Sequence, residues 1–219
     1  NRESDFFSQK ESKVSIKKAI YAAIDRNKIC EDIFSEKAKV ANYPEVEFRS
    51  LNVNLQKWAE ESKIEEYLSD SGYTLNKGEN LWQKKGQKLE LTLAYQTYWE
   101  QDYNMALAVK SMLTEKGITV HLIKYIPEET EISQIDLILF SYNGGIFPDD
   151  IQLFQKSGLP FLNSQMDISQ VSQFSFLENK EIGRLFYESY LADPWILPLI
   201  RPSEVMLLYS GLEIEKMKI

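Results

Sequence analysis

The chain has 219 residues, of which 43% are hydrophobic and 26% charged, and this composition excludes collagen-like, low-complexity and disordered classes. The formal net charge is −8, which argues against direct contact with nucleic acid, because proteins bind phosphates through an excess of Lys and Arg. The longest unbroken apolar run, 19–24, is far below the roughly 20 residues of a membrane-spanning helix.

The first part of the chain predicts two consecutive helices. Residues 1–13 are mostly polar and predict a segment that leads into the fold. Isoleucines then repeat every four residues from Ile16 to Ile24, which predicts a helix with one apolar stripe. Asp25 follows and is expected to cap a second, shorter helix over 26–35.

A loop, a third helix and a hairpin are predicted next. Residues 37–53 show no clear period and predict a loop. A helix is expected across 54–71, with Trp58 on its buried side and Gly72 at its end. The segment 82–87 has the pattern of a hairpin arm and a tight turn.

The middle of the chain predicts a parallel sheet. Apolar and polar residues alternate over 88–95, as in a strand with one buried face. A helix over 102–116 and a strand over 118–123 follow, so these three elements form a crossover unit with parallel strands. A third strand is predicted over 135–142.

The C-terminal part has a less regular pattern. We expect a helix over 179–190. Extended segments are predicted over 195–200 and 204–209, on either side of Pro202.

Catalytic and metal-binding motifs are scarce. His121 is the only histidine, so metal sites built from several histidines are excluded, and its strand position favours a structural, hydrogen-bonded role. The single cysteine, Cys30, forms no internal disulfide and is expected to be a small buried hydrophobic residue. Gly144 and Gly145 follow a strand without the residues that complete a nucleotide-binding loop. We therefore expect no enzyme activity, no metal and no cofactor.

Aromatic residues gather where two predicted strands end. Ligands of open parallel sheets bind outside the carboxyl ends of the strands, so these two positions predict a binding site. Its predicted ligand-binding residues are Tyr98, Trp99, Tyr142, Asn143 and Asp149. Aromatic rings can contact the side chains or backbone of a peptide, and the amide of Asn143 can form hydrogen bonds with the main chain of that peptide. The carboxylate of Asp149 can pair with a cationic group such as an amino terminus. The alternative is that these residues pack against another part of the protein.

Six segments, in order along the chain, resemble the C-terminal half of family 5 bacterial solute-binding proteins. Residues 16–29, IKKAIYAAIDRNKI, are similar to the family's helix V-R-x-A-I-x-x-A-I-D-R-x-x-I. The other five segments are Tyr67–Tyr73 (YLSDSGY), Lys85–Leu93 (KGQKLELTL), Glu115–Val120 (EKGITV), Ile135–Leu139 (IDLIL) and Trp195–Leu199 (WILPL).

The resemblance implies an α/β fold that is one lobe of a two-lobed periplasmic-binding-protein-like structure. This lobe is expected to contain a mixed sheet with a crossover helix, flanked by N-terminal helices. Residues 1–219 are then a single C-terminal lobe of a longer protein, in which 1–13 enter the lobe and 201–219 return toward a missing N-terminal lobe. The chain starts without methionine or a signal peptide, which also suggests an excised piece.

The function that the resemblance implies is non-catalytic binding of a peptide-like small solute by the substrate-binding protein of an ABC importer. Its implied partners are the solute, the N-terminal lobe and a membrane permease, with no direct nucleic acid contact by this segment. The full-length form is expected to be an extracytoplasmic, membrane-anchored lipoprotein.

Two departures from the family pattern support an alternative. The family's W-x-x-D-x-x-D-P loop is echoed by 142–149 without its tryptophan, and a later N-x-x-F-D element is absent. A compact C-terminus of this sort is similar to the sugar-phosphate-stress type of transcription regulator. The alternative is therefore the ligand-sensing solute-binding domain of a cytoplasmic helix-turn-helix regulator, with which the free Cys30 also agrees. A third hypothesis, an amide hydrolase using Asp149, lacks a base or nucleophile.

Overall fold

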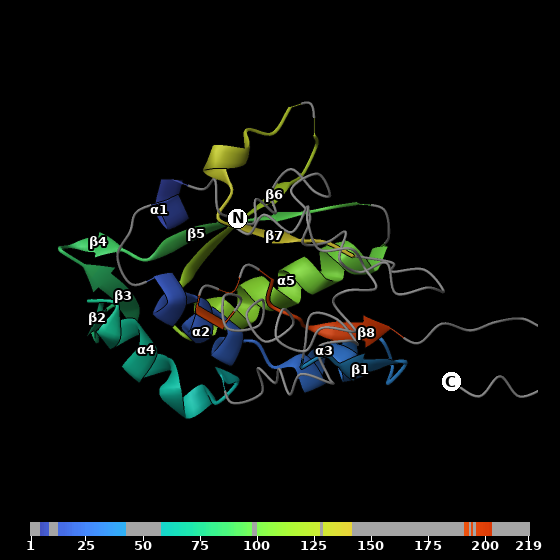
Figure 1. Ribbon diagram of the computed structural model, residues 1–219, viewed down its shortest axis with the longest axis horizontal. Helices are drawn as coiled ribbons and strands as arrows, with labels where there is room; N and C mark the ends of the chain where they lie inside the picture. The colour runs from blue at the N-terminus through green and yellow to red at the C-terminus, as the bar shows by residue number, and fades with distance from the viewer. Residues whose placement is uncertain are drawn as a thin grey trace, which may run out of the picture.

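The computed structural model describes residues 5–8, 13–42, 58–97, 100–127, 129–141, 191–192, 194 and 196–202 (Figure 1). Its helices are α1 (Asp5–Ser8), α2 (Lys13–Ala23), α3 (Arg26–Asp32), α4 (Ile64–Asp70) and α5 (Glu100–Glu115), with short 3₁₀ helices η3 (Glu61–Lys63) and η4 (Ile132–Gln134). Its strands are β1 (Ala38–Val40), β2 (Thr74–Asn76), β3 (Leu81–Lys84), β4 (Gln87–Lys88), β5 (Glu90–Tyr95), β6 (Thr119–Lys124), β7 (Leu137–Leu139) and β8 (Ile200–Pro202). Within these ranges, none of the helices combines the length and apolar character that crossing a membrane requires.

A parallel sheet of β6, β5 and β7, in that order, forms the centre of the fold (Figure 1). β5 pairs with β6 over six residues, from Glu90 opposite Thr119 to Tyr95 opposite Lys124. The helix between them, α5, packs on both strands. The predicted crossover unit and its parallel strands are therefore confirmed. In the described part of the chain, the antiparallel pairs expected of a mixed sheet lie in two separate sheets, β1–β8 and β2–β3–β4.

The apolar stripe of α2 lies in the core. Ile16 and Ile20 are 5% and 2% exposed, which confirms the predicted orientation of this helix. Ile24, which directly follows the last helical residue Ala23, is 6% exposed. Asp25 caps α3 as predicted, because its side chain accepts a hydrogen bond of 3.0 Å from the backbone N–H of Lys28. The second helix ends at Asp32 rather than at residue 35.

A buried arginine ties the α2–α3 junction to the start of β1. The guanidinium of Arg26 donates to the hydroxyl of Tyr21, to the carbonyl of Ala41 at 2.7 Å and to the side-chain oxygen of Asn42 at 3.1 Å. It also lies 4.5 Å from the centre of the Tyr21 ring. Burial raises the pKa of the Tyr21 hydroxyl to about 12, although Arg26 opposes this shift.

Tyr21 is expected to make the fold sensitive to strongly alkaline pH. The folded pKa of about 12 exceeds the unfolded value of 10.0, so between these values the unfolded chain has released a proton that the folded chain still holds. This contribution to stability is complete below pH 10 and is lost as the pH rises through 12, by roughly 3 kcal/mol in all. The free energy of unfolding, measured in urea at about pH 9 and about pH 11.5, should therefore fall more between these pH values for the native chain than for Tyr21→Phe. Equal falls in the two proteins would contradict the assignment.

Two predictions along 37–71 are partly wrong. The predicted loop contains β1, which pairs antiparallel with β8. In the predicted helix over 54–71, Trp58 is buried at 5% exposure, as expected. However, residues 59–60 are not helical, and the α-helix begins only at Ile64. Gly72 follows the helix with φ +79°, as a terminating glycine does.

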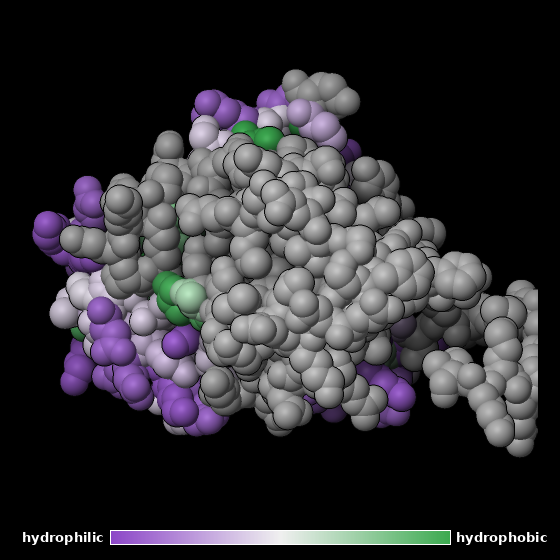
Figure 2. Space-filling model, in the orientation of Figure 1, coloured by the Kyte–Doolittle hydropathy of each residue, from purple (hydrophilic) through white to green (hydrophobic). Residues whose placement is uncertain are grey.

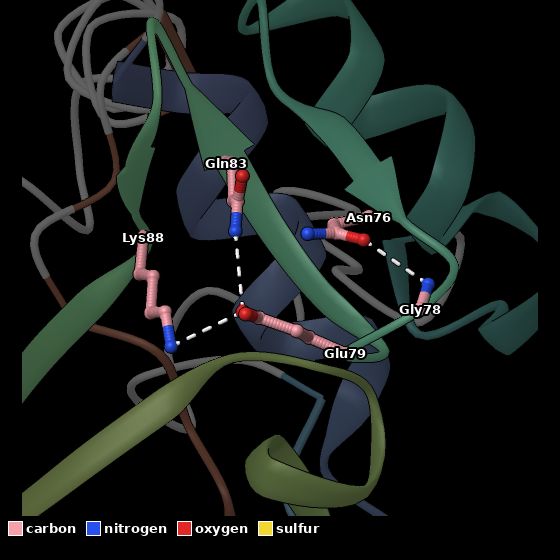
Figure 3. Close-up of polar contacts among 5 residues, drawn as sticks. All are labelled: Asn76, Gly78, Glu79, Gln83 and Lys88. Carbon is pink, nitrogen blue, oxygen red and sulfur yellow. Dashed lines mark hydrogen bonds and ion pairs between the residues drawn. The ribbon is translucent and has the colours of Figure 1, made fainter.

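The hairpin predicted over 82–87 is present as β3 and β4, and β2 adds a third strand that the sequence did not predict. Its two-residue turn places Lys85 and Gly86 at φ +52° and +79°. Figure 3 shows a polar cluster that joins the strands of this small sheet, centred on Glu79. The Glu79 carboxylate lies 3.1 Å from the ammonium of Lys88 and accepts a hydrogen bond of 3.4 Å from the amide of Gln83.

The hairpin is anchored to the turn between α5 and β6. The indole N–H of Trp82 donates to the carbonyl of Lys116 at 2.9 Å, and its backbone N–H donates to the carbonyl of Gly117 at 3.1 Å. Gly117 has φ +79°. One side-chain and one backbone hydrogen bond thus hold the hairpin to the turn that leads into the central sheet.

The predicted helix over 179–190 and the predicted extended segment over 204–209 lie outside the described residues. The described part of 195–200 contains the first residue of β8. The central strands are shifted or shorter than predicted, since β6 covers Thr119–Lys124 and β7 covers Leu137–Leu139.

Candidate functional site

The carboxyl ends of three parallel strands lie at one edge of the central sheet. Tyr95, the last residue of β5, is opposite Lys124 of β6 and Leu139 of β7. The polypeptide therefore leaves all three strands at neighbouring points. This is the edge at which open parallel sheets bind ligands.

The predicted ligand-binding residues follow directly from these strand ends but are not described by the structure. Tyr98 and Trp99 come shortly after β5, and Tyr142, Asn143 and Asp149 come after β7. All five lie outside the described residues. The topology brings the ends of β5 and β7 to the same edge, while the positions of the five predicted residues remain predictions.

Described residues at this edge connect β5, β7 and the first turn of α5. The rings of Tyr95 and Tyr103 are in contact, with centres 5.4 Å apart and planes at 44°. Tyr103 is 47% exposed, so its ring is available to a ligand. The hydroxyl of Ser141, just after β7, lies 3.5 Å from a carboxylate oxygen of the buried Asp102 in α5.

The sequence predicts aromatic residues at this edge, but it did not predict the contact between Asp102 and Ser141. A signal for Asp102 was present, because it precedes Met105 and Ala106 by three and four residues on the buried face of α5. No local pattern marks Ser141, which reaches Asp102 only through the pairing of β7 with β5.

The other chemically notable side chains lie away from this edge. Cys30 is buried in α3, and burial raises the pKa of its thiol, which keeps it protonated. The burial expected for Cys30 is thereby confirmed. His121 is exposed on β6, with Nε2 3.8 Å from a carboxylate oxygen of Glu90. Among the described residues, no group of acidic, histidine or cysteine side chains is arranged to hold a metal ion.

A cavity of about 300 Å³ lies at the opposite end of α5 from the aromatic edge. Its lining comes from the α2–α3 junction, from β1, from residues 59 and 61, and from the last turns of α5, including Met112, Glu115 and Lys116. Glu61 and Lys116 form an ion pair beside it. This end of α5 leads into the start of β6 and lies away from the carboxyl ends of the parallel strands, so the strand ends remain the candidate site.

The visible described surface is mainly hydrophilic, particularly over the β2–β4 hairpin and α4 on the left of Figure 2. In contrast, α5 carries two exposed large apolar side chains, Tyr103 and Leu107, one helical turn apart. Tyr103 belongs to the strand-end edge. This edge therefore presents aromatic rings, which suit binding by ring contact.

Comparison with known proteins identifies one family. Residues 4–159 match the family described as bacterial extracellular solute-binding proteins, family 5 Middle. This match covers more than half of the chain. No curated protein matches the sequence.

Several solved structures share the fold. NikZ from Campylobacter jejuni, in complex with Ni(L-His), is 18% identical with a TM-score of 0.71, over 92% of this chain and 43% of that one. The oligopeptide-binding protein AppA from Bacillus subtilis, in complex with a nonapeptide, is 18% identical with a TM-score of 0.68 over the same shares. A nickel ABC transporter from Bacillus halodurans is 22% identical with a TM-score of 0.65, over 92% of this chain and 44% of that one.

The chain therefore spans less than half the length of each of these proteins. The expected α/β fold is confirmed. The alternative of a cytoplasmic regulator receives no support from these matches.

Proposed function

Because the chain belongs to family 5 of the bacterial extracellular solute-binding proteins, we propose that it helps to bind a peptide-like small solute for an ABC importer. The family match over residues 4–159 carries this proposal. The role is binding without catalysis. Solutes of two kinds occupy the similar structures, a nonapeptide in AppA and Ni(L-His) in NikZ, and the aromatic strand-end edge favours the peptide.

The proposal includes the place of this chain in a larger molecule. Residues 1–219 form the C-terminal lobe, 1–13 enter it and 201–219 return toward an N-terminal lobe. The span of less than half of each similar structure supports this division. The two lobes close over the solute, and the closed form is the one that a membrane permease receives. The full-length protein works outside the cytoplasm as a lipoprotein.

A double variant tests where the solute binds. In the two-lobed protein, Tyr142→Ala combined with Asn143→Ala should weaken binding of a nonapeptide at least about tenfold, since a ring and an amide are lost. The melting temperature of the empty protein should stay nearly unchanged. Calorimetric titration measures the affinity, with Ni(L-His) as the second probe. Glu65→Ala with Glu66→Ala, on the exposed face of α4, is the control and should bind normally. Unaltered affinity in the Tyr142 and Asn143 variant would place the site elsewhere.

The isolated 219-residue chain is expected to bind the same probes weakly. One lobe supplies only part of the contact surface and loses the enclosure that gives small ligands their affinity. Dissociation constants above about 1 mM are therefore expected. Micromolar binding by the isolated chain would contradict the two-lobe proposal while leaving the family assignment intact.

A further inference from the structure

The cavity at the end of α5 that leads into β6 contains a buried positive charge. Arg26 lines this cavity and is only 7% exposed. The hydrogen bonds that its guanidinium donates, to Tyr21, Ala41 and Asn42, all come from Nη1. In the part of the chain that the structure describes, Nε and Nη2 have no acceptor and no carboxylate pairs with Arg26.

This arrangement leaves one edge of the guanidinium ready for an anion. Neutral acceptors and the ring of Tyr21 stabilise the charge of Arg26, but a buried cation without a counter-ion is still unfavourable. The Nε and Nη2 groups lie side by side in a planar fork, which matches the two oxygens of a carboxylate. Because the contacts of Nη1 already hold the side chain in place, little further side-chain order is lost when an anion binds.

The carboxylates that line the cavity already have other partners. The other charged residues in its lining are Asp25, Lys28, Glu61, Glu115 and Lys116. The Asp25 side chain caps α3, and that of Glu61 pairs with Lys116. The Glu115 carboxylate accepts a hydrogen bond of 3.2 Å from the Ser111 hydroxyl. All three carboxylates are exposed, so water screens their charge more than that of the buried guanidinium.

The remaining lining indicates the class of ligand. Its apolar residues are Ala22, Ala23, Ile24, Val40, Ala59 and Met112. The volume of about 300 Å³ is at the lower end of the range for small-molecule sites. Three acidic and three basic side chains line the cavity, which disfavours an anion with two charges, such as phosphate. The ligand is therefore small, singly charged and partly apolar.

We propose that this cavity binds a small monocarboxylate with a short apolar body, whose carboxylate pairs with Nε and Nη2 of Arg26. The C-terminal end of α5 is unfavourable for an anion, so the carboxylate lies at the α2–α3 junction and the apolar body lies toward Met112. This site is separate from the strand-end edge. Its occupant stabilises the junction that Arg26 ties to the start of β1.

Two ligands of the same shape test the role of charge. Isovalerate carries one carboxylate on a branched apolar body, and isovaleramide is its neutral counterpart. In ligand-observed NMR titrations of the two-lobed protein, isovalerate should bind at least tenfold more tightly than isovaleramide and than inorganic phosphate. Equal binding of isovalerate and isovaleramide, tighter binding of phosphate, or no saturable binding of isovalerate up to about 20 mM would each overturn the proposal.

Variants of the lining test the location. Ala59→Leu fills the cavity and leaves every contact of Arg26 in place, so it should weaken isovalerate binding at least tenfold. Arg26→Lys keeps the charge but loses the fork, and should weaken binding similarly. Lys39→Gln, exposed on β1 and outside the lining, is the control for loss of a positive charge and should bind normally. Circular dichroism checks the fold of each variant.

The Ala59→Leu variant also separates this site from the strand-end edge. Its affinity for the nonapeptide should equal that of the native protein, because the cavity lies at the other end of α5. Isovalerate binding that survives Ala59→Leu in the folded protein would show that the cavity is not the site. Isovalerate binding that is lost together with nonapeptide binding would show that the two sites are not separate.

Discussion

Replacing Gly117 by valine is expected to lower the free energy of unfolding by about 3 to 5 kcal/mol. Gly117 has φ +79°, a conformation that a β-branched residue adopts only under strain. A Cβ atom at this position would also lie 2.7 Å from the backbone carbonyl oxygen of Asn80 and 3.2 Å from the Trp82 ring. The carbonyl belongs to the main chain, so relief requires the hairpin to move away from the α5–β6 turn.

Gly86 provides the matched control for this prediction. It has the same φ of +79°, but nothing lies within 4 Å of an added Cβ. Gly86→Ala should therefore lose only about 1 to 2 kcal/mol, the cost of the backbone conformation alone. Urea unfolding of both variants measures the difference. If Gly117→Val were no less stable than Gly86→Ala, the close approach of hairpin and turn would be wrong.

The second large effect is expected at Ile24, where truncation to alanine should cost about 2 to 5 kcal/mol. Ile24 is 6% exposed and belongs to the main core cluster, so the substitution leaves a cavity between packed neighbours. Leu107→Ala is the control, because Leu107 is 41% exposed on α5. It should change stability by less than about 0.5 kcal/mol. A loss below that value for Ile24→Ala in chemical denaturation would mean that Ile24, just after the end of α2, faces water.

Local patterns predicted the elements that depend on local interactions. The signal for each of these features lies within a few neighbouring residues. The features are the four-residue repeat of α2, the Asp25 cap and the two-residue turn at Gly86, and all three are present. The strand β1 was missed because three residues carry no period. β1 forms because it pairs with β8, and the residues near β1 in the sequence do not predict this pairing.

The candidate site was predictable as a place but not as a set of contacts. Strand–helix–strand order places the ends of β5 and β6 at one edge, and the structure confirms that arrangement. The contact of Asp102 with Ser141 joins residues 39 positions apart. It depends on how α5 packs on the sheet. Such distances follow from packing, which a hydrophobic pattern does not specify.

The pairing of β1 with β8 also has a consequence for folding during synthesis. Val40 pairs with Ile200, so β1 leaves the ribosome roughly 160 residues before its partner is made. At about 5 to 20 residues per second this wait lasts roughly ten to thirty seconds. The helices and the crossover unit rely on nearer contacts and can form during that time. β1 meanwhile stays unpaired, and the nascent chain is most exposed to misassociation, or to capture by a chaperone, until Ile200 emerges.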